Sequence, residues 1–272
     1  MLAEGGEKAF VLAGGTDLLV RMKSDDFDAD LAVDIKSIDG MDSISESGGQ
    51  FTIGAAVPCA AMGENAALTA AWPGVVEAAN LIGSTQIQSR CTVAGNLCNA
   101  SPAADSVPAL VAAGAVAVVT GPDGTRNVDV ADMPAGPGRT TLAPAEIVTA
   151  ITLPARGDHG GDAYLRFIPR TEMDIAVVGA GVNLTLDAQG TITSARVSLG
   201  AVAPTVLLVD AAAAAITGTR LDDAALSALD TACAAACNPI DDKRGTVAFR
   251  KQVAGVLARR AARIAYDRAG GK

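Results

Sequence analysis

The sequence predicts an α+β protein of 272 residues, and three observations support this fold class. Short apolar runs that end in glycine turns, as strands do, occur through the first two thirds of the chain. Alanine-rich stretches with helical spacing of apolar residues lie between them. Two long helical segments follow near the carboxyl end. Because the length exceeds the usual size of one domain, we expect more than one structural unit.

The elements expected up to residue 153 follow from these patterns. Residues 83–90 are polar and are expected to be irregular, whereas the turn 121–124 (Gly-Pro-Asp-Gly) predicts a hairpin. In chain order we expect strands at 9–13, 31–35 and 51–54, helices at 18–23, 67–71, 74–82 and 105–113, and strands at 115–120 and 146–153.

Glycine and aspartate are concentrated in residues 155–162, which we expect to join two parts of the chain. Beyond this junction the pattern changes to longer strands and then to helices. The expected elements are strands at 163–168, 176–186 and 192–199 and helices at 222–237 and 246–268.

Composition excludes several classes of protein. The 21 basic and 30 acidic side chains give a net charge of −9, and no basic stripe is present to neutralise nucleic-acid phosphates. The longest apolar run, 107–119, is shorter than the roughly 20 residues of a membrane-spanning helix. The five cysteines are an odd number in a long chain, so we expect reduced thiols in a cytoplasmic protein.

Side chains for catalysis are scarce. The single histidine, His159, lies in a glycine-rich turn, and the cysteines lack the spacing of a zinc or iron–sulfur site. We therefore expect no catalytic residue and no metal ligand in this chain. If the protein is part of an enzyme, a cofactor or a partner chain must supply the reactive chemistry.

The first unusual segment connects an expected strand to an expected helix and contains two glycines and a threonine. Consecutive backbone N–H groups in such a curl can bind an anion, and the helix N-terminus adds partial positive charge. A tight turn with Thr16 or Asp17 as the N-cap explains the pattern equally well. The segment consists of Val11, Leu12, Ala13, Gly14, Gly15, Thr16, Asp17 and Leu18.

The second unusual segment, 92–105, places five polar residues between apolar neighbours. A buried polar group without a partner costs roughly 1–3 kcal/mol, so this density suggests a polar ligand. The alternative is a network of caps and turns in which Asp105 caps the following helix. Two such segments favour a large phosphorylated cofactor over proton transfer. The five residues are Thr92, Asn96, Asn99, Ser101 and Asp105.

Together, the two segments closely resemble the flavin-binding segments of one family, the FAD-binding medium subunits of molybdenum hydroxylases. This is the xanthine dehydrogenase and carbon monoxide dehydrogenase group. The resemblance covers essentially the whole chain. It continues through residues 164–167, 170–176, 199–204, 239–245 and 249–250 and the arginine-rich last helix.

The resemblance implies a two-subdomain FAD-binding fold of the PCMH or vanillyl-alcohol-oxidase type, followed by a C-terminal domain of the carbon monoxide dehydrogenase flavoprotein type. The implied parts are residues 1–50, 51–156 and 160–272. Members of the family usually begin earlier, with a strand and most of a helix. We therefore expect either a start site set too late or a truly absent first strand, which would leave an unpaired sheet edge.

The resemblance also implies a noncovalent FAD site. The first segment would wrap the pyrophosphate, and the second would hold the phosphates, ribitol and ring system. Arg166 would lie near the isoalloxazine, where a cation stabilises the charge that develops on reduction and raises the potential. The implied cofactor contacts are Val11, Leu12, Ala13, Gly14, Gly15, Thr16, Asp17, Leu18, Ile82, Thr92, Val93, Ala94, Gly95, Asn96, Asn99, Ser101, Asp105, Val148 and Arg166.

The chain departs from the family at three cofactor-side positions. Cys91 and Ala94 stand where the family usually has glycine, which would alter the approach of the backbone to FAD. Cys98 lies beside the same segment, and its oxidation would interfere with binding.

The function implied by the resemblance is that of an FAD-carrying electron-transfer subunit. Its partners would be a large subunit with the molybdenum cofactor and a small subunit with [2Fe–2S] clusters, in a dimer of heterotrimers. The flavin would pass electrons to NAD⁺, a quinone or another acceptor. Two alternatives are a stand-alone flavin-dependent oxidoreductase and a scaffold homologue without FAD. The sequence names neither the substrate nor the acceptor.

Overall fold

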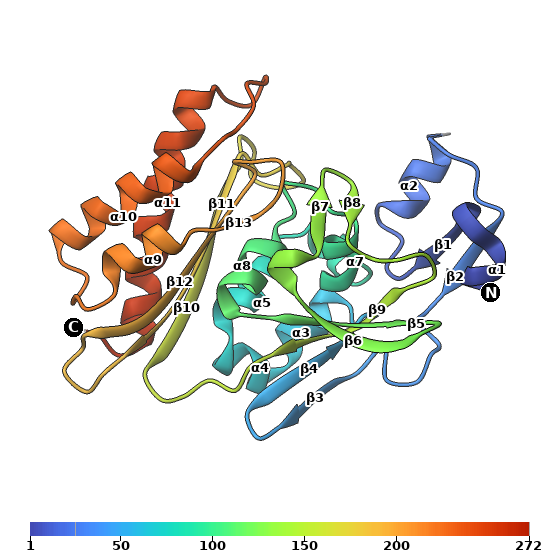
Figure 1. Cartoon of the computed structure of the whole chain (residues 1–272), viewed down its shortest axis with the longest axis horizontal. Coiled ribbons are helices and arrows are strands. Elements are labelled where there is room, and N and C mark those ends of the chain that lie inside the picture. Colours follow the sequence, from blue (N-terminus) through green and yellow to red (C-terminus); the bar gives the residue numbers. More distant parts are fainter. Residues whose placement is uncertain (25, 272) are drawn as a thin grey trace.

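The computed structural model describes residues 1–24 and 26–271 and confirms the α+β class. The described residues form four sheets, which Figure 1 shows arranged from the N-terminal part, through a central part, to a C-terminal sheet flanked by helices. None of the described helices is both long and apolar enough to cross a membrane.

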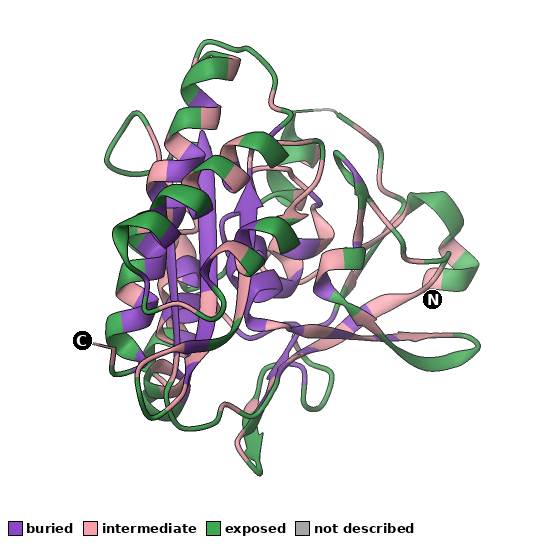
Figure 2. Cartoon of the chain, turned by 60° about the vertical axis from the view of Figure 1, so that its left-hand side comes forward, coloured by how far each residue is buried: buried purple, intermediate pink, exposed green. Residues whose placement is uncertain are grey.

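The N-terminal part is a small parallel unit. After α1 (Leu2–Gly5) and the 3₁₀ turn Gly6–Lys8, strand β1 (Ala9–Leu12) pairs in parallel with β2 (Leu31–Asp34), and α2 (Leu18–Lys23) connects them. None of the described residues before Ile35 is buried. Figure 2 shows this part in the colours of intermediate and exposed residues, whereas the other parts also contain buried strands and helix faces.

The central part is built on a five-stranded antiparallel sheet in the order β3-β4-β9-β5-β6. Its core includes Ile53, Ile151 and Leu110, all fully buried. Its strands are β3 (Ile44–Ser47), β4 (Gln50–Gly54), β5 (Val116–Gly121), β6 (Gly124–Asp129) and β9 (Ile147–Leu153). Its helices are α3 (Cys59–Glu64), α4 (Ala66–Ala71), α5 (Pro73–Ala79), α6 (Thr85–Gln88), α7 (Val93–Cys98) and α8 (Ser106–Ala113). Between β6 and β9 lie the 3₁₀ turn Val130–Asp132 and the small hairpin β7 (Pro134–Gly136) and β8 (Arg139–Thr140).

The C-terminal part is a four-stranded antiparallel sheet between helices. Its strands are β10 (Gly160–Phe167), β11 (Val178–Leu186), β12 (Ile192–Gly200) and β13 (Leu207–Leu208). Its helices are α9 (Asp210–Ile216), α10 (Asp223–Ala236) and α11 (Val247–Arg268). Helix α11 packs on β10 and β11, while α8 and α5 of the central part pack against the same sheet. The strands are consequently buried between helices, as Figure 2 shows.

Glycines allow this close packing of helices on the sheet. A Cβ atom at Gly181 would lie 2.6 Å from the carbonyl oxygen of Pro108 in α8. A Cβ atom at Gly161 would lie 2.0 Å from the carbonyl oxygen of Ala265 in α11. Since real side chains do not approach backbone so closely, these two positions require glycine.

The elements expected from the sequence occur close to their expected limits, but two stretches in which no helix was expected are helical. Residues 83–90, expected to be irregular, contain the single-turn helix α6, and residues 93–98 form helix α7. Valine, glycine, asparagine and cysteine are weak helix formers, so local propensity gave little indication. The Thr92 hydroxyl caps this helix, and Val93 and Leu97 are buried in the core, which together stabilise it.

Candidate cofactor site

An open cavity lies where the N-terminal part meets the central part. Its empty volume, which includes open solvent at the mouth, is about 1130 Å³. Its walls come from three regions: the β1–α2 connection, the region of α7, and an apolar surface built by the segment leading into β9 together with Ile35 and Ile82. The lining residues are Val11, Ala13, Gly14, Gly15, Thr16, Asp17, Leu18, Arg21, Ile35, Ala55, Ile82, Cys91, Thr92, Ala94, Gly95, Asn96, Cys98, Asn99, Gly138, Leu142, Glu146, Ile147 and Val148.

The first wall is the glycine turn between β1 and α2. A Cβ atom at Gly14 would lie 2.1 Å from the Arg90 carbonyl oxygen, and Gly15 has a left-handed φ of +74°. Both positions therefore favour glycine. The backbone N–H groups of Gly14, Gly15 and Thr16 have no hydrogen-bond partner among the described residues. Three unpartnered donors in a glycine turn before a helix are suited to bind an anion.

Two charged side chains hold or border this turn. Lys36 donates from Nζ to the carbonyl oxygen of Ala13 at 3.0 Å, which fixes the end of β1. Asp17 occupies the N-cap position of α2, but its carboxylate accepts no capping hydrogen bond. Partial burial raises the pKa of Asp17, and the charge of Arg21 opposes this shift.

The second wall is helix α7 and the residue that caps it. Thr92 Oγ1 accepts a hydrogen bond from Gly95 N at 2.9 Å. Asn96 Oδ1 accepts from both the backbone N (3.1 Å) and the hydroxyl (2.7 Å) of Ser106, so this side chain fixes α7 to α8. The amide nitrogen of Asn96 and the side chain of Asn99 make no hydrogen bond to the described residues, and both residues line the cavity. Two amide groups are thus available to a ligand.

The third wall is largely apolar. Ile82 and Val148 line it together with Ile35, Leu142 and Ile147. At its edge, Glu146 accepts two hydrogen bonds of 2.7 Å from the guanidinium of Arg126 and one of 2.7 Å from Ala143 N. These contacts, chiefly the one to Arg126, lower the pKa of Glu146 to about 2. This carboxylate therefore stays charged and fixed at the wall.

Five of the residues implied by the resemblance do not line the cavity: Leu12, Val93, Ser101, Asp105 and Arg166. Arg166 Nη1 donates to Asp105 Oδ2 at 2.7 Å, and the Tyr164 hydroxyl donates to Asp105 Oδ1 at 3.4 Å. Burial raises the pKa of Asp105, and Arg166 opposes this rise. The Asp105 carboxylate does not cap α8, because it pairs with Arg166. The Ser106 N–H at the start of α8 donates instead to Asn96 Oδ1.

Sequence reasoning missed several residues of the cavity. Ile35 directly follows β2, and the carboxyl ends of two parallel strands meet at one sheet edge, so it could have been found. The stretch 138–147 carries no local signal, since only long-range pairing brings it to the site. The lining residues not anticipated as cofactor contacts are Arg21, Ile35, Ala55, Cys91, Cys98, Gly138, Leu142, Glu146 and Ile147.

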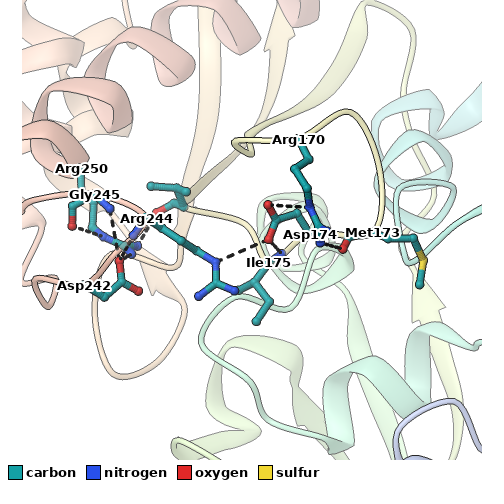
Figure 3. Close-up of polar contacts among 9 residues, drawn as sticks. Arg170, Met173, Asp174, Ile175, Asp242, Arg244, Gly245 and Arg250 are labelled. Atoms are coloured by element: carbon teal, nitrogen blue, oxygen red, sulfur yellow. Dashed lines mark hydrogen bonds and ion pairs between the residues drawn. The ribbon is translucent and has the colours of Figure 1, made fainter.

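The C-terminal motifs that carried the resemblance form a separate polar cluster, shown in Figure 3. The buried Arg250 donates from Nη1 to the carbonyl oxygens of Val177 (2.7 Å) and Ala201 (3.2 Å) and from Nη2 to Asp242 (2.7 Å). Asp174 forms ion pairs with Arg170 at 3.3 Å and Arg244 at 3.5 Å. These arginines tie together loops that are distant in the sequence, so the motifs support the fold.

The cavity residues fit FAD in their chemistry. The free N–H groups of the glycine turn suit a pyrophosphate, and the two free amides suit hydroxyl or ring polar atoms. The apolar third wall suits an aromatic ring system. The cavity walls therefore offer donors suited to a phosphate and an apolar surface suited to a ring.

Comparison with known proteins agrees with this geometry. Residues 1–156 match the FAD binding domain in molybdopterin dehydrogenase, and residues 163–265 match the CO dehydrogenase flavoprotein C-terminal domain. The carbon monoxide dehydrogenase medium chain of Afipia carboxidovorans is 34% identical over 99% of this chain and 93% of its own length. The xanthine dehydrogenase FAD-binding subunit of Escherichia coli O157:H7 is 27% identical over 97% of this chain and 91% of its own.

A solved structure gives the same result. Reconstituted CO dehydrogenase from Oligotropha carboxidovorans superposes with a TM-score of 0.94 at 34% identity, covering 98% of this chain and 93% of that one. The resemblance first read from the two glycine-containing segments is thereby confirmed. The chain belongs to the family of FAD-binding subunits of the molybdenum hydroxylases, which are oxidoreductases.

Proposed function

We propose that this chain is the noncovalent FAD-carrying electron-transfer subunit of a heterotrimeric molybdenum hydroxylase. Electrons would come from [2Fe–2S] clusters of a small subunit and leave to NAD⁺, a quinone or another acceptor. A large subunit with the molybdenum cofactor would oxidise the substrate, and the complex would be a cytoplasmic dimer of heterotrimers. When bound, FAD supplies the two-electron carrier chemistry.

The observation that carries the proposal is the set of unpartnered donors on the cavity walls. The N–H groups of Gly14, Gly15 and Thr16 would hold the pyrophosphate, and the amides of Asn96 and Asn99 would orient the ribitol and ring. Because these donors already lie in place, binding requires little rearrangement of the walls.

The apolar wall and the residues behind it complete this assignment. Ile82 and Val148 would contact the ring system and exclude water. Of the residues named by the resemblance, those that line the cavity would touch FAD. Leu12, Val93, Ser101, Asp105 and Arg166 do not line the cavity and would position the residues that do.

The proposed partners follow from the relatives. These include a carbon monoxide dehydrogenase medium chain and a 6-hydroxypseudooxynicotine dehydrogenase complex subunit alpha, names that belong to multi-subunit complexes. We infer that this chain likewise assembles with a large and a small subunit.

Titration with FAD tests the binding part of the proposal. The Asn99 side chain makes no hydrogen bond to the described residues, so Asn99→Ala should leave the fold intact. It should weaken FAD binding roughly three- to tenfold, as expected for one lost hydrogen bond. Asn127→Ala, on the exposed strand β6, is the matched control and should bind FAD as the wild type does.

Two further results would contradict the proposal. A wild-type chain that shows no flavin absorbance after incubation with FAD, and releases none in acid, would instead be a scaffold homologue. An isolated chain that turns over an organic substrate would be a stand-alone oxidoreductase. Copurification with a larger and a smaller metal-bearing chain would support the heterotrimer.

A further inference from the structure

Two cysteines distant in the sequence meet behind the cavity wall. Cys59 begins helix α3, and Cys91 directly precedes Thr92, the cap of α7. The backbone N–H of Cys59 donates to the carbonyl oxygen of Cys91 at 2.9 Å. This direct backbone contact makes the two residues neighbours in space, as a disulfide between them requires.

The two thiols also lie close enough to influence each other's ionisation. The neighbouring Cys91 raises the pKa of Cys59, and the neighbouring Cys59 lowers the pKa of Cys91. Negative charge is therefore favoured on Cys91. Since the thiolate is the nucleophilic form of cysteine, Cys91 is the first of the two to react with an oxidant.

Access favours the same order of reaction. Cys59 is fully buried and Cys91 is 3% exposed, yet Cys91 belongs to the cavity lining and Cys59 does not. A small molecule that enters the cavity therefore reaches Cys91 first. The other buried pair, Cys233 and Cys237, lies in the C-terminal core, where Cys237 donates to the Cys233 carbonyl oxygen at 3.1 Å.

We propose that Cys59 and Cys91 form a reversible dithiol–disulfide site in the wall of the cavity, with hydrogen peroxide as the oxidant. The Cys91 sulfur attacks one peroxide oxygen, the O–O bond breaks, and the products are a sulfenic acid and one water. The Cys59 sulfur then attacks the Cys91 sulfur, the S–O bond breaks, and a second water leaves. In total, two thiols and one peroxide give one disulfide and two waters.

The disulfide has a consequence for the first wall of the cavity. Gly14 packs directly on Cys91, since a Cβ atom on Gly14 would lie 2.9 Å from the Cys91 Cα. A disulfide brings the two sulfur atoms to about 2.05 Å, so the backbone of Cys91, on which Gly14 packs, must adjust. Resting here on the proposed function, we expect the oxidised chain to bind FAD at least threefold more weakly than the reduced chain.

Mass mapping of the FAD-free chain tests the disulfide itself. After brief treatment with hydrogen peroxide and alkylation in denaturant, we expect a linked peptide pair containing Cys59 and Cys91, which dithiothreitol separates again. Cys233 and Cys237 should remain open to alkylation as internal controls. In Cys59→Ser, Cys91 should instead gain oxygen as sulfenic or sulfinic acid.

Two outcomes would overturn the inference. One is alkylation of Cys59 and Cys91 to the same extent with and without peroxide. The other is a disulfide from Cys91 to Cys98, the third thiol of the cavity region. Both outcomes are read on wild-type protein, so poor folding of a variant cannot obscure them.

FAD titration of the oxidised and reduced chains separates this inference from the proposed function. A linked peptide in a chain that binds no FAD in either form would refute the proposed function and uphold the disulfide site. Equal FAD affinity of both forms would overturn the coupling of the disulfide to the cavity.

Discussion

The guanidinium carbon of Arg156 lies 3.7 Å from the centre of the Trp72 ring. The same guanidinium donates to the Ala71 carbonyl oxygen (2.7 Å), to Asp162 Oδ1 (2.8 Å) and to Asn183 Oδ1 (3.0 Å). One side chain therefore joins the helices of the central part to strands β10 and β11. Asp162 in turn accepts a hydrogen bond from Val75 N at the start of α5.

Replacing Arg156 should loosen this junction. Burial raises the pKa of Asp162, and Arg156 is the main group that opposes the rise. Arg156→Ala would leave a buried carboxylate without its cation, at a cost of about 3–5 kcal/mol in the free energy of unfolding. Urea unfolding measures this loss. Arg263→Ala, which removes only an exposed ion pair to Asp223, should change the unfolding free energy by less than ~0.5 kcal/mol.

A side chain at Gly14 should damage the cavity. The added Cβ in Gly14→Ala would collide with the backbone at Arg90 and Cys91, so the glycine turn must shift. We expect a loss of roughly 1–3 kcal/mol in stability and at least tenfold weaker FAD binding, measured by unfolding and by FAD titration. Gly157→Ala is the matched control, because nothing lies within 4 Å of its Cβ. Normal FAD affinity in Gly14→Ala would show that the turn does not form the phosphate site.

The ion pair at the third wall should give a pH-dependent contribution to stability. The pKa of Glu146 is lowered from 4.5 to about 2 in the folded chain, so its contribution is fully present above pH 4.5 and disappears as the pH falls toward 2. The difference in urea midpoint between wild type and Glu146→Gln should therefore narrow between pH 5 and pH 3. For Glu64→Gln, an exposed position in α3, the difference should stay near zero. A constant difference for Glu146→Gln would contradict the assignment.

The buried pair of Asp105 and Arg166 should respond asymmetrically to substitution. Arg166→Met leaves Asp105 buried without its cation and should cost about 3–5 kcal/mol in unfolding free energy. The double variant Asp105→Asn with Arg166→Met should recover more than half of this loss, which a double-mutant cycle measures. Additive losses would show that the two residues act independently.

The resemblance implies that Arg166 raises the reduction potential of the flavin, and this role can be measured separately from protein stability. A fixed cation near the isoalloxazine predicts a lower flavin reduction potential in Arg166→Met. An unchanged potential would show that Arg166 only pairs with Asp105 and does not influence the flavin.

Much of the fold was predictable because local patterns determine it. Apolar runs identify β5, β11 and β12, and the glycine turn 121–124 predicts the hairpin that places β6 beside β5. Helix α7 was missed because its stability comes from burial of Val93 and Leu97 and from the Thr92 cap, and burial is a tertiary property.

The site was predictable to the extent that its backbone is unusual. Gly14 and Gly15 are conspicuous because the turn requires glycine, and both line the cavity. Glu146 was not predictable, since its position depends on Arg126, a residue of another strand. The position of Asp105 before a helix predicts an N-cap. In the structure its carboxylate instead forms an ion pair with Arg166, which is distant in the sequence.

That no described residue before Ile35 is buried has a thermodynamic consequence. The β1–β2 unit has little apolar interior of its own, although its turn supplies one wall of the cavity. Contacts with a bound ligand would then stabilise the folded form of this unit. Part of the free energy of binding would therefore be used to keep the unit folded. Amide hydrogens of Val11 and Val33 would consequently exchange with solvent faster in the empty chain than in the loaded one.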